Sequence, residues 1–342
     1  MCSSDLSLRA VVHPTSSGTL GLALPAGVGW TATSSTLGPL TVLLPSTTLT
    51  AAADRFDVGY LDPVVVSGTL TRDAGGLVSG LARAAVSIRD TSAGGLVSTL
   101  GSAVVAANGS WSATVRPRSA GTLSAVYTGG PGLPAATVEL GALTVGTWTS
   151  SVSLSVQNVQ LAAGAADPVS GTVSRQYQGI ASTAAGVPVG IYLVNTLGVS
   201  SLLRTVSTTA NGSFSSTVTP MENGTVIARI ASVPGYTDAA SDPVGVAVTS
   251  KLTLTAPSVT TGGRPASLTV QLTPARAGTV TIQELVGGSW VGLTTASAAS
   301  TGRATLSLAG LALGNHVLRA WFDGDGRGGA GASSSITVSV RT

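Results

Sequence analysis

Two carboxylates spaced as in a calcium loop are the clearest candidate for chemistry in this sequence. Asp323 and Asp325 stand at positions i and i+2, where two acids can begin a loop of oxygen ligands. A complete loop needs further oxygen ligands and a later bidentate acid, and Arg327 occupies the third ligand position. The pattern therefore favours an Asp/Gly hairpin turn over a calcium site, and we assign no metal-ligating residue.

Groups for catalysis are sparse. His13 and His316 are the only histidines, and a Ser-His-Asp site needs its three groups brought together. The sequence has no Gly-x-Ser-x-Gly elbow, no paired-histidine zinc motif and no phosphate loop. The single cysteine, Cys2, excludes an intramolecular disulfide and Cys-based zinc sites. We expect no enzyme activity, no catalytic or cofactor-binding residue and no cofactor.

Other short patterns also favour structural interpretations. Residues 324–329 fit the Gly-x-Gly-x-x-Gly pattern, but they lie between two predicted strands, whereas a dinucleotide site needs a helix after the glycines. Asn108, Asn211 and Asn223 match the Asn-x-Ser/Thr glycosylation pattern. For Asn108 and Asn211 the following glycine favours a turn. Residues 44–48 faintly resemble a sortase signal and are interpreted as a junction.

Aromatic side chains are the remaining candidates for binding. Trp111 and Phe214 share a register with core-facing neighbours and are predicted to be buried. Trp321 precedes Phe322, and adjacent strand residues point to opposite faces, so burial of Phe322 would leave Trp321 exposed or in a contact. Exposed tryptophans can stack on sugars. The settings of three others stay open, namely Trp30, Trp148 and Trp290.

Composition narrows the class of protein. Charged residues make up 9% and hydrophobic residues 43% of the chain, and the 17 basic residues are spread without a cluster. Nucleic-acid binding would need a basic patch, so it is excluded. No apolar run approaches the roughly 18 residues of a transmembrane span, and no signal peptide precedes the first strands. Lys251 is the only lysine among many arginines, which favours a GC-rich, actinobacterial source.

A domain-length repeat organises the chain. Residues 107–116 match residues 210–219 at seven of ten positions, 103 residues apart. In each copy Asn-Gly predicts a type I′ hairpin turn, and an alternating strand follows. The offset stays constant over some eighty residues, so the copies differ by no insertion. Strands are predicted at the following positions: 48–50, 64–71, 85–88, 96–105, 110–116, 121–127 and 136–145, with equivalents in the second copy, then 252–254, 268–272, 279–285, 304–308, 317–322 and 335–340.

These patterns predict four segments. Residues 46–146 and 147–249 are two complete repeats, and residues 250–342 form a divergent third. Residues 1–45 match the second half of an earlier repeat, so they are expected to expose apolar side chains such as Leu8, Ala10 and Val12. Met1 to Leu6 resemble translated sequencing-adapter read-through. We therefore expect the chain to be a fragment of a longer protein.

The repeat resembles a known group of domains. At residues 66–69, 107–111 and 115–117 it resembles immunoglobulin-like (Ig-like) or prealbumin-like repeats of bacterial secreted and surface proteins. Residues 314–325 look like bacterial Ig-like repeats in which a late strand ends at a Gly-Asp hairpin. The resemblance implies extracellular spacers, adhesin stalks, cell-wall-associated proteins and accessory modules of secreted hydrolases, and it carries no catalytic residue.

Together these observations predict an all-β chain of tandem antiparallel β-sandwich domains in a monomeric rod. The expected role is a non-catalytic spacer, stalk or interaction module of an extracellular or cell-surface bacterial protein. One alternative is a set of carbohydrate- or cell-wall-binding modules of a secreted hydrolase, and another is a phage virion protein. The expected partner is a cell-wall polysaccharide or a surface protein.

Overall fold

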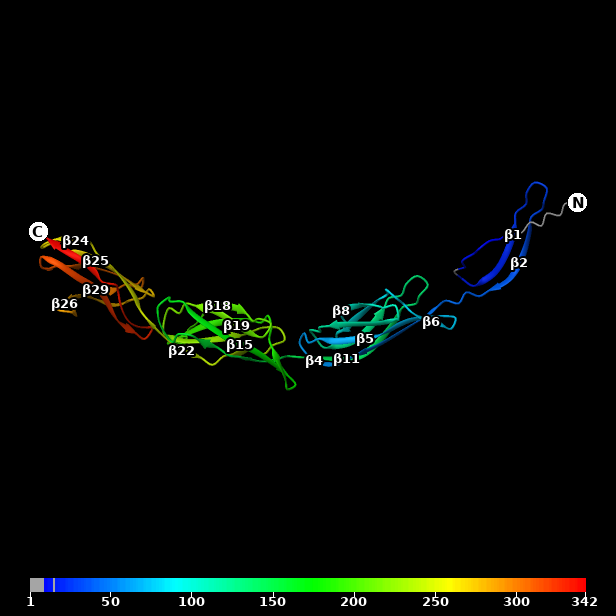
Figure 1. Ribbon diagram of the computed structural model, residues 1–342, viewed down its shortest axis with the longest axis horizontal. Helices are drawn as coiled ribbons and strands as arrows, with labels where there is room; N and C mark the ends of the chain where they lie inside the picture. The colour runs from blue at the N-terminus through cyan, green and yellow to red at the C-terminus, as the bar shows by residue number, and fades with distance from the viewer. Residues whose placement is uncertain (1–8, 15) are drawn as a thin grey trace. The chain divides into compact units, whose positions relative to one another are not determined.

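The computed structural model describes residues 9–14 and 16–342. The predicted read-through at Met1–Leu6 and the predicted exposure of Leu8 lie outside these residues. The described chain consists of strands, turns and loops, and it contains no helix that could cross a membrane (Figure 1). It divides into two compact units, Met1–Gly146 and Thr147–Thr342. Each unit is described by itself.

The first unit begins with a two-stranded hairpin of β1 (Gly18–Leu24) and β2 (Thr33–Leu40). Gly18 pairs with Leu40, as Gly121 pairs with Leu143 in the β10–β11 hairpin 103 residues later, and both hairpins shift register at the third pair. The β1–β2 hairpin has no second sheet to cover it. Its side chains and the preceding Ala10 and Val12 are largely exposed.

The rest of the first unit is a sandwich of two sheets. Its central strands are β5 in the first sheet, which pairs with β3 and β9, and β10 in the second, which pairs with β7 and β11. The strands are β3 (Ser46–Ala53), β4 (Asp57–Gly59), β5 (Val64–Ala74), β6 (Leu77–Gly80), β7 (Ala85–Thr91), β8 (Val97–Val104), β9 (Ser110–Val115), β10 (Gly121–Tyr127) and β11 (Ala136–Gly146). Alternate residues of these strands, such as Val86, Ile88, Leu123 and Ala125, are fully buried between the sheets.

The second unit repeats this topology twice. The strands of the second sandwich are β12 (Thr149–Val152), β13 (Ser155–Val156), β14 (Gln160–Ala162), β15 (Asp167–Tyr177), β16 (Ile180–Thr183), β17 (Pro188–Asn195), β18 (Ser200–Ser207), β19 (Ser213–Val218), β20 (Gly224–Ile230), β21 (Ala239–Ala240) and β22 (Val244–Thr249). Those of the third are β23 (Lys251–Thr255), β24 (Val259–Thr261), β25 (Ala266–Thr273), β26 (Gly278–Val286), β27 (Ser289–Ala298), β28 (Arg303–Leu308), β29 (Gly314–Asp325), β30 (Gly328–Ala332) and β31 (Ile336–Arg341). Each sandwich has a hydrophobic core of its own. The predicted all-β fold of tandem Ig-like sandwiches is therefore confirmed.

The sheets are antiparallel apart from one short edge strand in each sandwich. β4 runs parallel to β11, β14 runs parallel to β22, and β24 runs parallel to β31. Each of these strands follows the first strand of its sandwich after the chain has crossed to the opposite sheet. The crossing reverses no direction, so the short strand pairs in parallel. These strands are too short to show alternation in the sequence.

The predicted type I′ hairpin turns at Asn108-Gly109 and Asn211-Gly212 are wrong. The strands that flank the first turn lie in different sheets, because β8 pairs with β7 and β9 pairs with β5. Only the glycines have positive φ, 86° at Gly109 and 78° at Gly212. The Asn108 Oδ1 atom instead accepts the backbone N–H of Ser110 at 3.0 Å. The turn therefore carries the chain from one sheet to the other.

The glycine of this turn also docks on the opposite sheet. The carbonyl of Gly109 accepts the N–H of Leu70 at 2.8 Å, and the carbonyl of Gly212 accepts that of Val173 at the same distance. A Cβ at Gly212 would lie 2.6 Å from the Val173 carbonyl oxygen, closer than real contacts allow. Gly302, at a Thr-Gly step, makes the equivalent bond to Leu272 at 2.8 Å.

The burial predicted for Trp111 and Phe214 is confirmed, at 4% and 3% exposure. Each ring packs beside a glycine on the paired strand, since Trp111 is opposite Gly68 and Phe214 is opposite Gly171. A Cβ at Gly171 would lie 2.4 Å from Cζ of Phe214 and 2.1 Å from the Ser153 carbonyl oxygen. The glycine is therefore required by its neighbours, and the Ser-Gly-Thr pattern of both repeats has a packing cause.

We expect Gly171→Ala to destabilise the second sandwich by about 3 kcal/mol, because the added methyl overlaps backbone and ring atoms that cannot move apart. Chemical denaturation of the full chain measures this loss. Gly245→Ala is the matched control, since a Cβ there meets no atom within 4 Å. It should change the unfolding free energy by less than about 0.5 kcal/mol. Equal effects of the two substitutions would contradict the packing argument.

Candidate functional site: the joint between the second and third sandwiches

The second and third sandwiches are joined strand to strand. β22 ends at Thr249 and β23 begins at Lys251, so Ser250 alone separates them. The joint is tied at this point, because Thr249 pairs with Gly329 of β30 and the Ser250 N–H donates to the Gly329 carbonyl at 3.0 Å. The third sandwich therefore meets the second through backbone hydrogen bonds.

A buried arginine supports the hairpin that makes these contacts. Arg276 is 6% exposed, and its Nε donates to Oδ2 of Asp325 at 2.8 Å while its Nη2 donates to Oγ of Ser250 at 2.7 Å. Its guanidinium also lies 5.1 Å from the centre of the Phe322 ring. A buried guanidinium is costly unless it is paired, so these bonds fix the position of the hairpin between β29 and β30.

The tip of that hairpin is clasped by loops of the second sandwich. Nε of Arg327 donates to Oε2 of Glu222 at 2.6 Å, and the Asn223 N–H donates to the Arg327 carbonyl at 2.7 Å. Oγ1 of Thr196 donates to the Gly326 carbonyl at 3.0 Å. We call these contacts of Thr196, Glu222 and Asn223 with residues 326–327 the clasp.

Electrostatics favour the closed clasp. Partial burial acts to raise the pKa of Glu222, but hydrogen bonds from Arg327 and Asn195 outweigh it and hold that pKa below the ordinary carboxyl value. The same hydrogen bond raises the pKa of Arg327. Both groups are therefore more stable in their charged forms when the clasp is closed.

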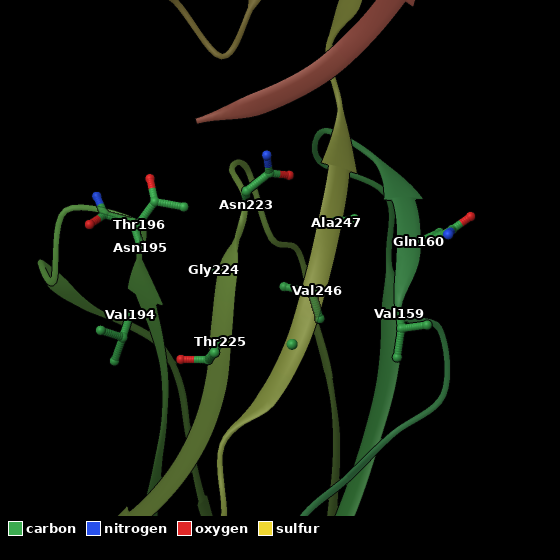
Figure 2. Close-up of a pocket in the computed structure, with 11 residues that line it drawn as sticks. Val159, Gln160, Val194, Asn195, Thr196, Asn223, Gly224, Thr225, Val246 and Ala247 are labelled. Atoms are coloured by element: carbon green, nitrogen blue, oxygen red, sulfur yellow. The ribbon is translucent and has the colours of Figure 1, made fainter. Parts of the chain in front are cut away.

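A shallow groove of about 630 Å³ lies in the second sandwich beside the clasp. Figure 2 shows Val194, Thr225 and Val246 along neighbouring strands, with Asn195 and Asn223 grouped at one end. No charged side chain lines it. Oδ1 of Asn223 accepts the N–H of Val248 at 2.7 Å, so this glycosylation candidate supports the edge of the joint.

The two carboxylates considered for calcium are committed to the hairpin. Oδ1 of Asp325 accepts the N–H groups of Arg327 and Gly328, each at 2.9 Å, and Oδ1 of Asp323 accepts Nε1–H of Trp321 at 2.6 Å. Within residues 9–14 and 16–342, no group of three or more His, Cys, Asp and Glu side chains could hold a metal ion. Residues 324–329 lie between β29 and β30, as the sequence predicts.

The tryptophans fall into different settings. Trp148 is buried at 3% exposure, with its ring 5.9 Å from that of Tyr177 and the guanidinium of Arg175 at 4.1 Å. Trp30 is 60% exposed on the loop between β1 and β2.

Trp290 and Trp321 share one face of the third sandwich. The guanidinium of Arg319 lies 4.2 Å from the Trp290 ring centre and 5.2 Å from that of Trp321. Phe322 is buried, so Trp321 faces outward into this contact as predicted. Arg319 covers the ring faces on which a sugar would stack.

His316 takes part in an ion pair at the end of the third sandwich. Its Nδ1 lies 2.5 Å from Oε1 of Glu284, and its Nε2 lies 2.9 Å from the Ala312 carbonyl oxygen. Both ring nitrogens face acceptors, which suits the doubly protonated ring. The bond to Ala312 and then that to Glu284 raise the pKa of His316. His13 is exposed and far from any such arrangement in the sequence.

Sequence reasoning missed the residues of the joint. Glu222, Arg276 and Arg327 are isolated charges in a chain poor in charged residues, and none lies in a recognisable pattern. The one available signal was the lack of a linker at Thr249-Ser250, which indicates contact between neighbouring domains without naming the residues.

We expect His316 to titrate above the ordinary histidine pKa of about 6.5. Because its pKa is raised in the folded state, the stability it adds is complete below about pH 6.5 and is lost as pH rises through the folded value. NMR titration of the imidazole protons measures this directly. Glu284→Gln should lower the pKa of His316, and an unchanged pKa would contradict the role of the ion pair.

We expect Glu222→Gln to loosen the joint, because it removes the negative partner of Arg327. The swapped double variant Glu222→Arg with Arg327→Glu should restore most of the rigidity. Since the pKa of Glu222 is lowered, the joint should hold above about pH 4.3 and loosen as pH falls through the folded value.

The measurement for this joint is ¹⁵N relaxation of the full chain, which gives a rotational correlation time for each sandwich. Closed joints give equal times for the second and third sandwiches. Glu139→Gln, which removes a carboxylate of the first unit, is the control. Unequal times in the unmodified protein at neutral pH would contradict the clasp.

Comparisons with known proteins agree with the fold. Residues 252–341 match the family model "Bacterial Ig-like domain (group 3)". No curated protein matches the chain. Among solved structures, it is similar to a tetra-tandem repeat from the extending region of a large adhesion protein, at 19% identity over 95% of this chain and 82% of the other, with a TM-score of 0.31.

Two further structures of adhesins are similar at low identity. For FdeC of Escherichia coli the identity is 17% over 89% of this chain and 99% of the other, with a TM-score of 0.27. For InvE of Yersinia pseudotuberculosis it is 21% over 60% of each chain, with a TM-score of 0.29. The matched segment, residues 252–341, coincides with the third sandwich, which is therefore a bacterial Ig-like domain.

Proposed function

We propose that this chain is a non-catalytic spacer of a secreted or surface-exposed bacterial protein, built from Ig-like domains at residues 46–146, 147–249 and 250–342, with residues 1–45 matching the second half of another repeat. The observation that carries the proposal is the joint around Ser250. A spacer must hold its modules at fixed separations, and a joint without a free linker does so.

The joint suits this role because it combines three kinds of restraint. The backbone pairing of Thr249 with Gly329 fixes direction, the buried Arg276 fixes the hairpin, and the clasp restrains rotation at the hairpin tip. None of these contacts uses a long apolar surface. The modules can therefore fold separately and still dock in one orientation.

Extracellular or cell-surface placement follows from the same proposal, with a surface protein or a cell-wall polysaccharide as the partner. The family matched by residues 252–341 is described as bacterial, which supports this setting. Stacking of sugars on Trp290 and Trp321 is not favoured, because Arg319 already covers their ring faces.

The proposal has a mechanical test. Residual dipolar couplings of the full chain should fit one alignment tensor for residues 147–249 and 250–342 together. Insertion of Gly-Gly-Ser-Gly-Gly-Ser between Thr249 and Ser250 should require two tensors, because a flexible tether lets the modules reorient. Two tensors in the unmodified chain would count against a spacer.

The setting has a separate test. Antibodies raised against the chain should label intact cells of the source bacterium, or a secreted fraction, without permeabilisation. A control antibody against a cytoplasmic protein should label only permeabilised cells. Labelling confined to the cell interior would contradict the proposed placement.

A further inference from the structure

A second cavity, unrelated to the joint, opens in the first sandwich. It measures about 840 Å³ and lies between the edge strands β8 and β9, where the two sheets separate. Most of its lining carries hydroxyl or guanidinium groups. The polar lining residues are Asp90, Ser92, Ser98, Thr99, Thr114, Arg116, Arg118 and Ser119.

Asp90 is the unusual member of this lining. It is 3% exposed and follows Val86 and Ile88 on the inward face of β7. Its Oδ1 is buried and has no hydrogen-bond partner among the described residues. Burial raises the pKa of the Asp90 carboxyl. A buried carboxylate oxygen without a donor costs free energy, so a protein that keeps one needs a reason.

The other two sandwiches show how this position is usually filled. Asp90 pairs with Leu123, as Leu193 pairs with Val226 and Glu284 pairs with Leu318 in the equivalent strands. The second sandwich therefore places an apolar Leu193 there. The third places an acid that is satisfied by His316, at 2.5 Å.

The first sandwich keeps the acid but lacks its partner. The position equivalent to His316 is Gly121, and a Cβ there would lie 2.0 Å from Oδ1 of Asp90. No side chain can grow from this position while Asp90 keeps its place. The donor that Asp90 requires must therefore come from elsewhere.

We propose that this cavity binds a neutral sugar, whose hydroxyl groups donate to Asp90 and accept from the arginines at the rim. A hydroxyl can donate and accept at once, which matches a lining that offers a buried acceptor, several hydroxyls and two guanidinium groups. One or two sugar rings fit a cavity of this size.

Charge argues against a cationic ligand. Arg116 and Arg118 are both exposed at the rim, so a cation approaching Asp90 would pass two positive groups. Nη1 of Arg116 already donates to the Leu61 carbonyl at 3.0 Å, which holds its side chain at the mouth of the cavity. A neutral ligand meets no such barrier.

The test is an NMR titration of the ¹⁵N-labelled full chain with neutral tetrasaccharides of glucose, N-acetylglucosamine, mannose and galactose. At least one should shift the amide signals of Ser92, Thr114 and Gly121. Asp90→Asn keeps the shape of the side chain and should weaken binding at least tenfold. Asp90→Leu copies the second sandwich, and it should abolish binding and raise the melting temperature, because it removes the unpartnered carboxylate.

Asp323→Asn is the matched control and should leave binding unchanged, since Asp323 lies in the other unit. No shift with any of the four sugars would overturn the proposal, as would shifts that both Asp90 variants leave unaltered. Binding of a tetra-arginine peptide in place of the sugars would also overturn it. The joint around Ser250 takes no part in this test, so either proposal can fail alone.

Discussion

Each sandwich depends on one cross-strand pair in which a large side chain lies opposite a small one. The pair joins the central strand of the first sheet to the strand after the crossing turn, and its combined volume fills the space between the sheets. In the first two sandwiches the small member is a glycine on the central strand, whereas the third reverses the sizes. The pairs are Gly68 with Trp111, Gly171 with Phe214, and Val270 with Ala304.

Because this packing fixes the sheets, the ends of the sandwiches are free to vary. The inward position near the end of β7 and its equivalents holds Asp90, Leu193 or Glu284, three residues with different demands. Leucine completes the core, glutamate pairs with His316, and aspartate leaves an acceptor open to a cavity. One scaffold thus gives a closed end, an ion-paired end and an open end without a change in topology.

The joint between the second and third sandwiches follows the same economy of charge. In a chain with 9% charged residues, Arg276 is buried and Arg327 is paired with Glu222 across the junction. Charges in such a neutral surface act with few competitors nearby, so a small number of them selects one docking orientation. The two carboxylates that resembled a calcium loop serve this hairpin instead.

The sequence by itself determined the fold class, the repeat and most strands, because alternation along a strand is a local property with a period of two. It also predicted the burial of Trp111 and Phe214. It did not determine which strands pair, so the Asn-Gly turns were assigned to hairpins although their strands belong to different sheets. The orphan carboxylate of Asp90 and the partners of Arg276 and Arg327 were decided only by the tertiary structure, since each depends on residues distant in sequence that the packing of sheets brings together.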